Sequence, residues 1–340
     1  MILNFEHQNA SHCETGIVVN LLNFYGYKFS EPVIFGISTG FYFAYMPMFK
    51  GDRGVPLVSF RTFPGTIITR TLRKLNIKMH TKRYSKSEKD KAMQEMDALL
   101  AAGIPVGNKV GMHFLHYMPR EIREHWNIHH FIVIGKKNDD YIVSESLYGI
   151  KRVSYNDLKR VRFAEGRLKP RGKMYWVKKM PKQLPDINTL IINSIKTTCR
   201  NMVGIYALPM SSCIGVRGMV KLSKFVRNLE ANLGEKAPVF LAKMIRHQEE
   251  LTTGGAGYRF IYGAFLSEAA DILNKPKLKE FSAEINHIGN QWQQFAIEGG
   301  RKLKNRNSIS YNELADMLLK LAAAEKEFFI ALKREIQQKS

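Results

Sequence analysis

The sequence HCETGIVVNLL at residues 12–22 places a single early cysteine directly before an apolar run. Apolar residues recur there at helical spacing, and Gly26 stands where a residue in the left-handed conformation would end a helix. We therefore predict that Cys13 lies at or just before the first turn of a helix. Unpaired backbone N–H groups and the helix dipole stabilise a thiolate at that position, which makes Cys13 a candidate nucleophile. The alternative is a small buried hydrophobic residue, which is what most free cysteines are.

The length and the distribution of apolar residues predict two domains. The chain has 340 residues, more than one hydrophobic core usually serves, and 45% of them are hydrophobic. Pro181 and Pro185 mark a boundary, and helical periodicity dominates beyond it. We expect an α+β fold, with a mixed domain at residues 1–182 and an all-α domain at residues 186–340. Helices of the second domain are expected at residues 187–203, 218–233, 237–251, 258–273, 276–299 and 310–338.

The chain is strongly basic, with 52 Lys and Arg against 30 Asp and Glu and a formal charge of +22. Such an excess speeds the encounter with anionic partners and says nothing about the fold. The candidate partners are nucleic acid, an anionic membrane surface and an acidic protein such as an acyl carrier. No zinc-finger spacing, aromatic RNA-binding signature or clear helix-turn-helix accompanies the charge, so we do not expect nucleic acid as the partner. The most basic segment, residues 151–182, is either a docking surface or a solvated edge and linker.

Neither the beginning of the chain nor its apolar stretches indicate export or a membrane span. The first residues carry no basic run, apolar core and cleavage site, so we expect a cytoplasmic protein. Cys13, Cys199 and Cys213 cannot all pair and are expected to be reduced thiols. The most apolar window, residues 33–49, contains glycines and a proline and falls short of the ~20 residues of a spanning helix. We therefore expect no transmembrane segment.

Two apolar runs about a polar turn predict a β-hairpin, with strands at residues 129–135 and 141–145. His130 begins its first strand and Glu145 ends its second. Antiparallel pairing brings these two strand ends together. A histidine and a carboxylate are therefore expected to be neighbours in space.

Acyl transfer through a cysteine needs a thiolate, a base within hydrogen-bond reach and a third group that orients the imidazole. Cys13, His130 and Glu145 supply these groups in the papain-like order, in which the cysteine opens a helix and the other two lie on neighbouring strands. His129 competes for the role of base, because one of two adjacent strand residues faces the cleft and the other faces away. We favour His130 because it directly abuts the apolar strand.

Other polar residues are candidates for supporting roles. Gln8 is a candidate donor to an oxyanion, together with the backbone N–H of Cys13, and His12 is a candidate pocket residue. Histidines also gather within residues 113–130, but no carboxylate-rich or H-E-x-x-H helix accompanies them, so we expect no metal site.

A glycine-rich segment, TTGGAGYR at residues 252–259, lies between two predicted helices. Glycines before a helix can form a backbone cradle for an anion, and Arg259 adds positive charge. The segment is neither a Walker loop nor a G-x-G-x-x-G after a strand. Two interpretations of this segment therefore remain. It is either an anion site that includes Gly254, Gly255 and Arg259 or a tight interhelical turn.

Several of these segments resemble one known family. Residues 5–15, 30–36 and 130–145 resemble the N-terminal domain of the butirosin-biosynthesis acyltransferase family, and residues 215–219 and 253–269 resemble its helical C-terminal domain. The resemblance spans nearly the whole chain. It implies a papain-like (C39-peptidase-like) fold in the first domain, used for acyl transfer rather than proteolysis.

The resemblance also implies roles and partners. Cys13 would receive an acyl group from an acidic acyl carrier protein and His130 would be the base, while Glu145 stands where related sequences commonly have Asp. No bound cofactor is implied, because the donor is the phosphopantetheine arm of the carrier, for which residues 151–182 and the segment Gly254, Gly255 and Arg259 are candidate contacts. The acceptor would be a small-molecule amine or hydroxyl in secondary-metabolite biosynthesis, such as the aminoglycoside of butirosin assembly.

Two other functions fit the same residues. A papain-like cysteine peptidase or amidase would use the same triad with water as the final acceptor. A non-catalytic protein would keep the papain-like shell to bind a carrier protein or nucleic acid.

Overall fold

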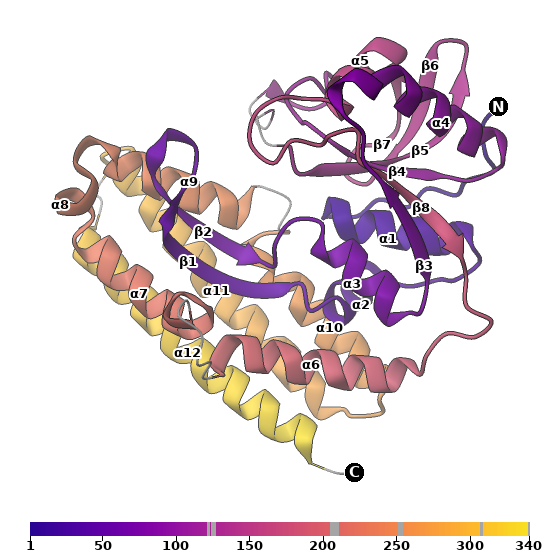
Figure 1. The fold of residues 1–340 in the computed structure, drawn as a ribbon. Helices are drawn as coiled ribbons and strands as arrows, with labels where there is room; N and C mark the ends of the chain where they lie inside the picture. The colour runs from indigo at the N-terminus through magenta and orange to yellow at the C-terminus, as the bar shows by residue number, and fades with distance from the viewer. Residues whose placement is uncertain (121–122, 124–126, 205–210, 251–253, 307–308, 339–340) are drawn as a thin grey trace. The chain divides into compact units, whose positions relative to one another are not determined.

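The computed structural model describes residues 1–120, 123, 127–204, 211–250, 254–306 and 309–338. It divides into a sheet unit, Met1–Ile34 with Pro64–Pro185, and a helical unit, Phe35–Phe63 with Asp186–Ser340 (Figure 1). The expected α+β class is confirmed. Among the described residues, no helix is both long and apolar enough to span a membrane. A cytoplasmic location stays a prediction.

The sheet unit is built on six strands in the order β3-β8-β4-β5-β6-β7, with every neighbouring pair antiparallel. The predicted hairpin is present as β5 and β6, joined at Asn138, which takes the left-handed φ of 56° that a tight turn requires. The strands are β3 (Lys78–Lys82), β4 (Val106–Val110), β5 (His129–Lys137), β6 (Asp140–Glu145), β7 (Gly149–Ser154) and β8 (Met174–Lys179). The helices that accompany them are α1 (Cys13–Phe24), α3 (Thr66–Lys74), α4 (Lys89–Ala101) and α5 (Tyr155–Arg162).

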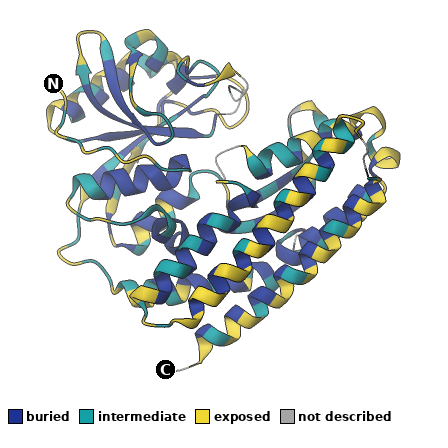
Figure 2. Cartoon of the chain, turned by 180° about the vertical axis from the view of Figure 1, so that it is seen from behind, coloured by how far each residue is buried: buried dark blue, intermediate teal, exposed yellow. Residues whose placement is uncertain are grey.

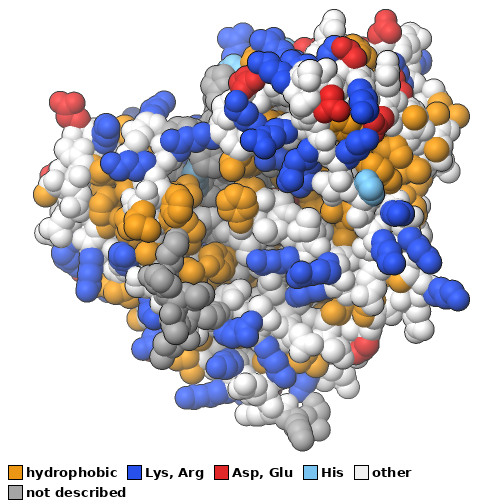
Figure 3. Space-filling model, in the orientation of Figure 1, with side chains coloured by type: hydrophobic (Ala, Val, Ile, Leu, Met, Phe, Trp, Pro, Cys, Tyr) orange, Lys and Arg blue, Asp and Glu red, His pale blue; other side chains and the backbone are white. Residues whose placement is uncertain are grey.

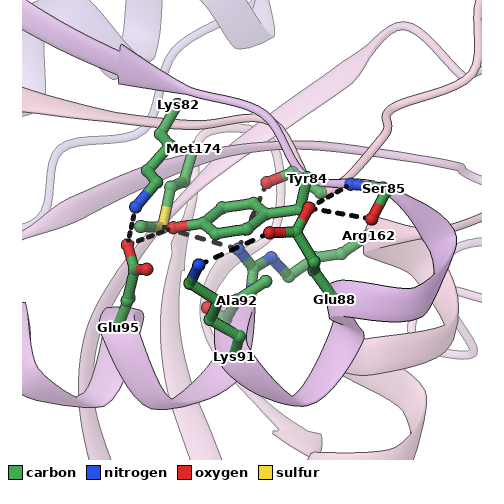
Figure 4. A network of polar contacts seen from close by, with 10 residues as sticks. Lys82, Tyr84, Ser85, Glu88, Lys91, Ala92, Glu95, Arg162 and Met174 are labelled. Carbon is green, nitrogen blue, oxygen red and sulfur yellow. Dashed lines mark hydrogen bonds and ion pairs between the residues drawn. The ribbon is translucent and has the colours of Figure 1, made fainter.

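One face of the sheet carries the core of this unit, where Phe131, Val133 and Val143 pack with α4 and α5 residues. The helix α1 packs against α3 and β5. The buried Arg162 joins the layers, because its guanidinium donates to the carbonyl oxygen of Ala92 at 3.0 Å (Figure 4) and to that of Gly172 at 3.3 Å. These two hydrogen bonds from a buried cation fix α5 against α4 and against the turn before β8.

The helical unit contains a β-hairpin as well as helices. Its strands β1 (Phe41–Lys50) and β2 (Pro56–Arg61) pair with each other, and α7 packs on β1. The helix α2 (Glu31–Ile37) spans the junction of the two units. The remaining helices are α6 (Ile187–Val203), α7 (Gly215–Arg227), α8 (Leu229–Leu233), α9 (Ala237–Glu249), α10 (Arg259–Ile272), α11 (Lys277–Leu303) and α12 (Tyr311–Gln337).

The expected helices are found, with differences at some of their ends, and α11 continues four residues beyond the predicted end at 299. The helix predicted at 218–233 begins at Gly215 and is divided into α7 and α8. The end predicted at Leu251 lies outside the described residues. The long helices α11 and α12 bury one side and expose the other, as amphipathic helices at a surface do (Figure 2).

The expected continuous domain at residues 1–182 needs a correction, because residues 35–63 pack within the helical unit. The ring of Phe41 lies 4.9 Å from that of Tyr262 and 5.5 Å from that of Phe329. Phe60 meets Trp292 edge to face at 5.5 Å. The aromatic residues of the hairpin therefore complete a core whose other members lie far away in the sequence, and sequence position alone assigned them to the wrong unit.

Candidate active site

Polar contacts hold the chain at the start of α1. His12 is the N-cap residue, and its ring Nδ1 accepts the N–H of Thr15 at 3.4 Å. The carboxylate of Glu31 accepts the N–H groups of Ser11 (2.8 Å) and His12 (2.9 Å) and the hydroxyl of Thr15 (2.6 Å). Cys13 is consequently fixed as the first residue of the helix, as predicted, and is 5% exposed. His12 caps the helix, and its role as a pocket residue stays a prediction.

The segment after β6 lies directly on α1. The N–H of Ala10 donates to the carbonyl oxygen of Ser146 at 2.8 Å, and the Ser146 hydroxyl donates to the carbonyl oxygen of Cys13 at 3.4 Å. A Cβ on Gly16 would lie 2.4 Å from the Ser146 Oγ. Glycine at this position therefore permits the close approach that brings the end of β6 to the cysteine.

The expected pairing of a histidine with Glu145 is present, but the histidine is His129. Its Nε2 lies 2.7 Å from the Glu145 Oε2, and the two side chains are 2% and 0% exposed. Glu145 Oε2 also accepts the hydroxyl of Tyr117 at 2.9 Å, and Oε1 accepts the N–H of Leu147 at 3.4 Å. The Cys13 side chain lies close enough to the imidazole to raise the pKa of His129. Since Nε2 is engaged by the carboxylate, Nδ1 is the ring nitrogen left for the sulfur.

The charges of this site favour a protonated imidazole. Burial would lower the pKa of His129, but the charge of Glu145 and the hydrogen bonds with Cys13 and Glu145 outweigh it and raise the pKa to about 10. Burial and the Glu145 charge hold the pKa of Tyr117 well above its usual range, so that Tyr117 stays a donor. The arrangement can thus hold an imidazolium beside a thiolate, with the carboxylate behind the ring.

His130, the preferred base in the sequence analysis, lies on the opposite face of β5. Its Nδ1 is 3.1 Å from the hydroxyl oxygen of Tyr175 on β8. The prediction that His130 is the neighbour of Glu145 was wrong, because β5 contains a bulge: Gly135 pairs with Ile142, whereas Val133 pairs with Val143. The extra residue, Ile134, moves the upstream part of β5 by one position, which exchanges the faces of the two histidines.

Gln8 is exposed, and its main chain is fixed to α1 by the Asn20 side chain. The Gln8 N–H donates to the Asn20 Oδ1 at 2.7 Å, and its carbonyl oxygen accepts the Asn20 Nδ2 at 2.8 Å. These bonds hold the segment that precedes Cys13 in place. The role of the Gln8 amide as an oxyanion donor stays a prediction.

The glycine-rich segment belongs to the helical unit and binds the protein's own carboxylates. Arg259 is fully buried and donates from Nε (2.9 Å) and a terminal nitrogen (2.6 Å) to Glu325, which also accepts the indole N–H of Trp292 at 2.7 Å. The N–H of Ala256, next to Gly255, donates to Glu249 at 3.1 Å. The expectation that Arg259 binds an external anion is therefore wrong, because its guanidinium pairs with Glu325 in the core. For Gly254 and Gly255 the expectation stays a prediction. Leu251 to Thr253 lie outside the described residues.

Sequence reasoning missed Tyr117 and Glu31. Tyr117 lies in irregular chain after β4, 28 residues before the carboxylate it contacts, where no periodic pattern marks it. Glu31 could have been suspected, since an acidic residue often begins a helix, but its contacts with the start of α1 are long-range.

As for a metal, the described residues contain no group of three or more His, Cys, Asp or Glu placed to hold an ion, and His125 lies outside them.

A cysteine that opens a helix, beside a histidine and a carboxylate on neighbouring antiparallel strands, defines a papain-like site. In a comparison with family models, residues 12–146 match the model described as butirosin biosynthesis protein H, N-terminal, and residues 156–332 match a domain of unknown function, DUF4872. The second match alone spans more than half of the chain. The chain therefore belongs to the family that carries this domain, here joined to the butirosin biosynthesis protein H type of N-terminal domain, and the resemblance noted in the sequence is confirmed.

Solved structures give weaker similarities. The peptidase domain of Streptococcus ComA, a bifunctional ABC transporter involved in a quorum-sensing pathway, is 13% identical with a TM-score of 0.31 and covers 52% of this chain and 98% of its own. A putative C39-like peptidase from Bacillus anthracis is 14% identical with a TM-score of 0.33 and covers 53% and 98%. At these TM-scores neither similarity bears on the activity of this chain. No curated protein gives a significant match.

Proposed function

We propose that this protein is a cysteine-dependent acyltransferase that moves an acyl group from an acyl carrier protein thioester, through Cys13, to an amine or hydroxyl acceptor. The observation that carries the proposal is the buried contact of His129 with both Cys13 and Glu145 at the start of α1. The match of residues 12–146 to a butirosin biosynthesis protein supports a biosynthetic reaction.

In the first half-reaction the thiolate of Cys13 attacks the thioester carbonyl carbon, and the carbonyl oxygen becomes an oxyanion. The backbone N–H of Cys13 and the Gln8 amide are candidate donors to that oxygen. The tetrahedral intermediate then expels the carrier thiolate, which takes the proton from the His129 imidazolium. Cys13 is left as an acyl thioester and His129 is neutral.

In the second half-reaction the acceptor amine attacks the acyl-Cys13 carbonyl carbon and passes its proton to His129. Expulsion of the Cys13 thiolate releases an amide and restores the imidazolium. Glu145 holds Nε2 throughout, so that Nδ1 remains directed to the sulfur and the acceptor. The low exposure of Cys13 supports transfer over hydrolysis, because a buried acyl thioester meets little water.

The covalent step is tested by incubating the full chain with an acyl-phosphopantetheine thioester and measuring its intact mass. We expect an increase by one acyl group, absent in Cys13→Ala and present in Cys199→Ala, a matched buried cysteine. An added amine should discharge the adduct and yield an amide. Full activity of Cys13→Ala would overturn the proposal, and release of free acid at a rate independent of the amine would assign a peptidase or amidase instead.

A further inference from the structure

Basic residues from consecutive strands form a row across one face of the sheet unit. Lys109 on β4 pairs with His130 on β5, and on its other side its N–H donates to the carbonyl oxygen of Lys173 at 3.0 Å. Lys82 on β3 pairs with Met174 on β8, so that the next residue of β3, Arg83, lies opposite Lys173. Residues opposite one another in antiparallel strands project from the same face. Arg83, Lys173 and Lys109 therefore stand side by side, and His130 ends the row.

This row lies beside the start of α1. Glu14, which follows Cys13, accepts the N–H groups of Gly65 (2.8 Å) and Ile67 (3.2 Å) at the beginning of α3. A Cβ on Gly65 would lie 4.0 Å from the Lys173 Nζ. Lys173 thus reaches the same helix terminus as Glu14, one residue from the candidate nucleophile.

Tyr175 lies across this row and contacts His130 at its end. A Cβ on Gly107 would lie 2.1 Å from the ring of Tyr175, so the ring crosses β4 where no side chain stands in its way. Its hydroxyl thereby reaches the His130 Nδ1 on β5. His130 is held in this contact, and the Lys173 Nζ lies 5.9 Å from the centroid of the same tyrosine ring.

Arg83, Lys109 and Lys173 outnumber the carboxylates near them. Within the described part of the chain, no carboxylate forms an ion pair with Arg83, Lys109 or Lys173, and Lys109 Nζ donates only to the Leu168 carbonyl oxygen at 2.8 Å. Burial and the charges of Lys173 and Arg83 lower the pKa of Lys109 to about 8, and burial and Arg83 lower that of Lys173, while Glu14 opposes both shifts. Figure 3 shows how densely Lys and Arg gather on the visible face of this unit.

We propose that Arg83, Lys109 and Lys173 bind a phosphate group of a substrate that reacts at Cys13. The inference rests on the proposed function for the identity of the substrate. Three cations against the one carboxylate of Glu14 leave two positive charges, which match the nearly dianionic charge of a phosphate monoester at neutral pH. The phosphate belongs either to the pantetheine arm of the donor or to a phosphorylated amine acceptor.

The test uses the full chain with Cys13→Ser, which binds without forming a thioester, and isothermal titration with two pairs of probes. The donor pair is 4′-phosphopantetheine and pantetheine, and the acceptor pair is glucosamine 6-phosphate and glucosamine. We expect the phosphorylated member of one pair to bind about tenfold more tightly or better, and Lys109→Met and Lys173→Met each to remove about tenfold of that affinity. The pair that discriminates identifies the source of the phosphate.

Lys178→Met is the matched control, because Lys178 is an exposed lysine on β8, five residues further along the chain than Lys173. It should bind phosphate as the parent does, and thermal melting should show all three variants folded. Equal binding of both members in both pairs, or an equal loss in the control, would overturn the proposed site. Retained phosphate binding without any acyl-Cys13 adduct would leave the site standing and reject the acyltransferase.

Discussion

The Nε2 of His129 lies 2.7 Å from the Oε2 of Glu145, with both side chains buried and the Cys13 side chain in contact with the same imidazole. The carboxylate also accepts a hydroxyl and a backbone N–H, so its position is fixed independently of the histidine. A carboxylate held in this way orients the ring and stabilises its protonated form. Four predictions follow from this contact and from the corrected assignments.

The first prediction concerns pH. Because the pKa of His129 is raised from 6.5 to about 10, the imidazolium should persist through neutral pH, and kcat/KM for acyl transfer should fall only as pH rises through about 10. The stability linked to this pair is complete below about pH 6.5 and is lost as pH rises toward 10. Urea unfolding and transfer rates over this range check both statements. In Glu145→Gln the alkaline fall should move toward neutral pH, and an unmoved profile would contradict the assignment.

The second prediction separates the two adjacent histidines. His129→Ala should lower the rate of Cys13 acylation by about 10²- to 10⁴-fold, the usual contribution of a general acid or base. His130→Gln should lose far less, since His130 contacts Tyr175 on the other face of the sheet. Single-turnover acylation followed by intact mass measures both rates. A larger loss in His130→Gln than in His129→Ala would contradict the structure.

The third prediction treats Tyr117 as a positioning residue. Tyr117→Phe removes a donor to the Glu145 Oε2 and should cost about 1 kcal/mol of stability with a several-fold loss of kcat. Without that hydrogen bond the carboxylate interacts more strongly with the imidazolium, so the alkaline limb of the pH profile should move upward. A purely structural tyrosine would change the stability and leave the pH profile in place. Tyr148→Phe, a neighbouring ring 6.1 Å away, is the control.

The fourth prediction concerns Arg259, whose guanidinium pairs with Glu325 in the core of the helical unit. Arg259→Met leaves the buried carboxylate without its cation and should lower the free energy of unfolding by about 3–5 kcal/mol. Replacing both residues, with Glu325→Leu, should recover part of this loss. The phosphate affinity of the folded variants should not change. A selective loss of phosphate binding in Arg259→Met at unchanged stability would restore the anion-binding assignment.

Local sequence was sufficient for the elements themselves. The apolar spacing after Cys13 predicted α1, the two apolar runs about Asn138 predicted the β5–β6 hairpin, and the periodicity beyond Pro185 predicted the helical unit. These features depend on neighbours within a few residues, which the chain itself displays. The choice of Glu145 as the acid partner rested on the same hairpin.

Contacts between distant segments decided the rest. The hairpin aromatics joined the helical unit because their partners lie in α10, α11 and α12. Arg259 was drawn into the core by Glu325, 66 residues further on. No local pattern records either pairing, since each depends on how the helices pack.

The identity of the histidine that contacts Glu145 shows most clearly what local sequence decided and what the tertiary structure decided. A hairpin continued without interruption from the pair Lys137 and Asp140 would set Ile132 opposite Glu145. His130 would then project from the same face of the sheet as Glu145. The bulge at Ile134 shifts the register by one residue, so that His129 takes the place of His130 on the face of Glu145. The carbonyl oxygen of Ile134 accepts the N–H of Leu3 at 2.9 Å, so the N-terminal segment pairs with the bulged part of β5. The sequence determined that a histidine, a carboxylate and a cysteine would meet, and a one-residue shift, supported by a segment more than a hundred residues away, decided which histidine.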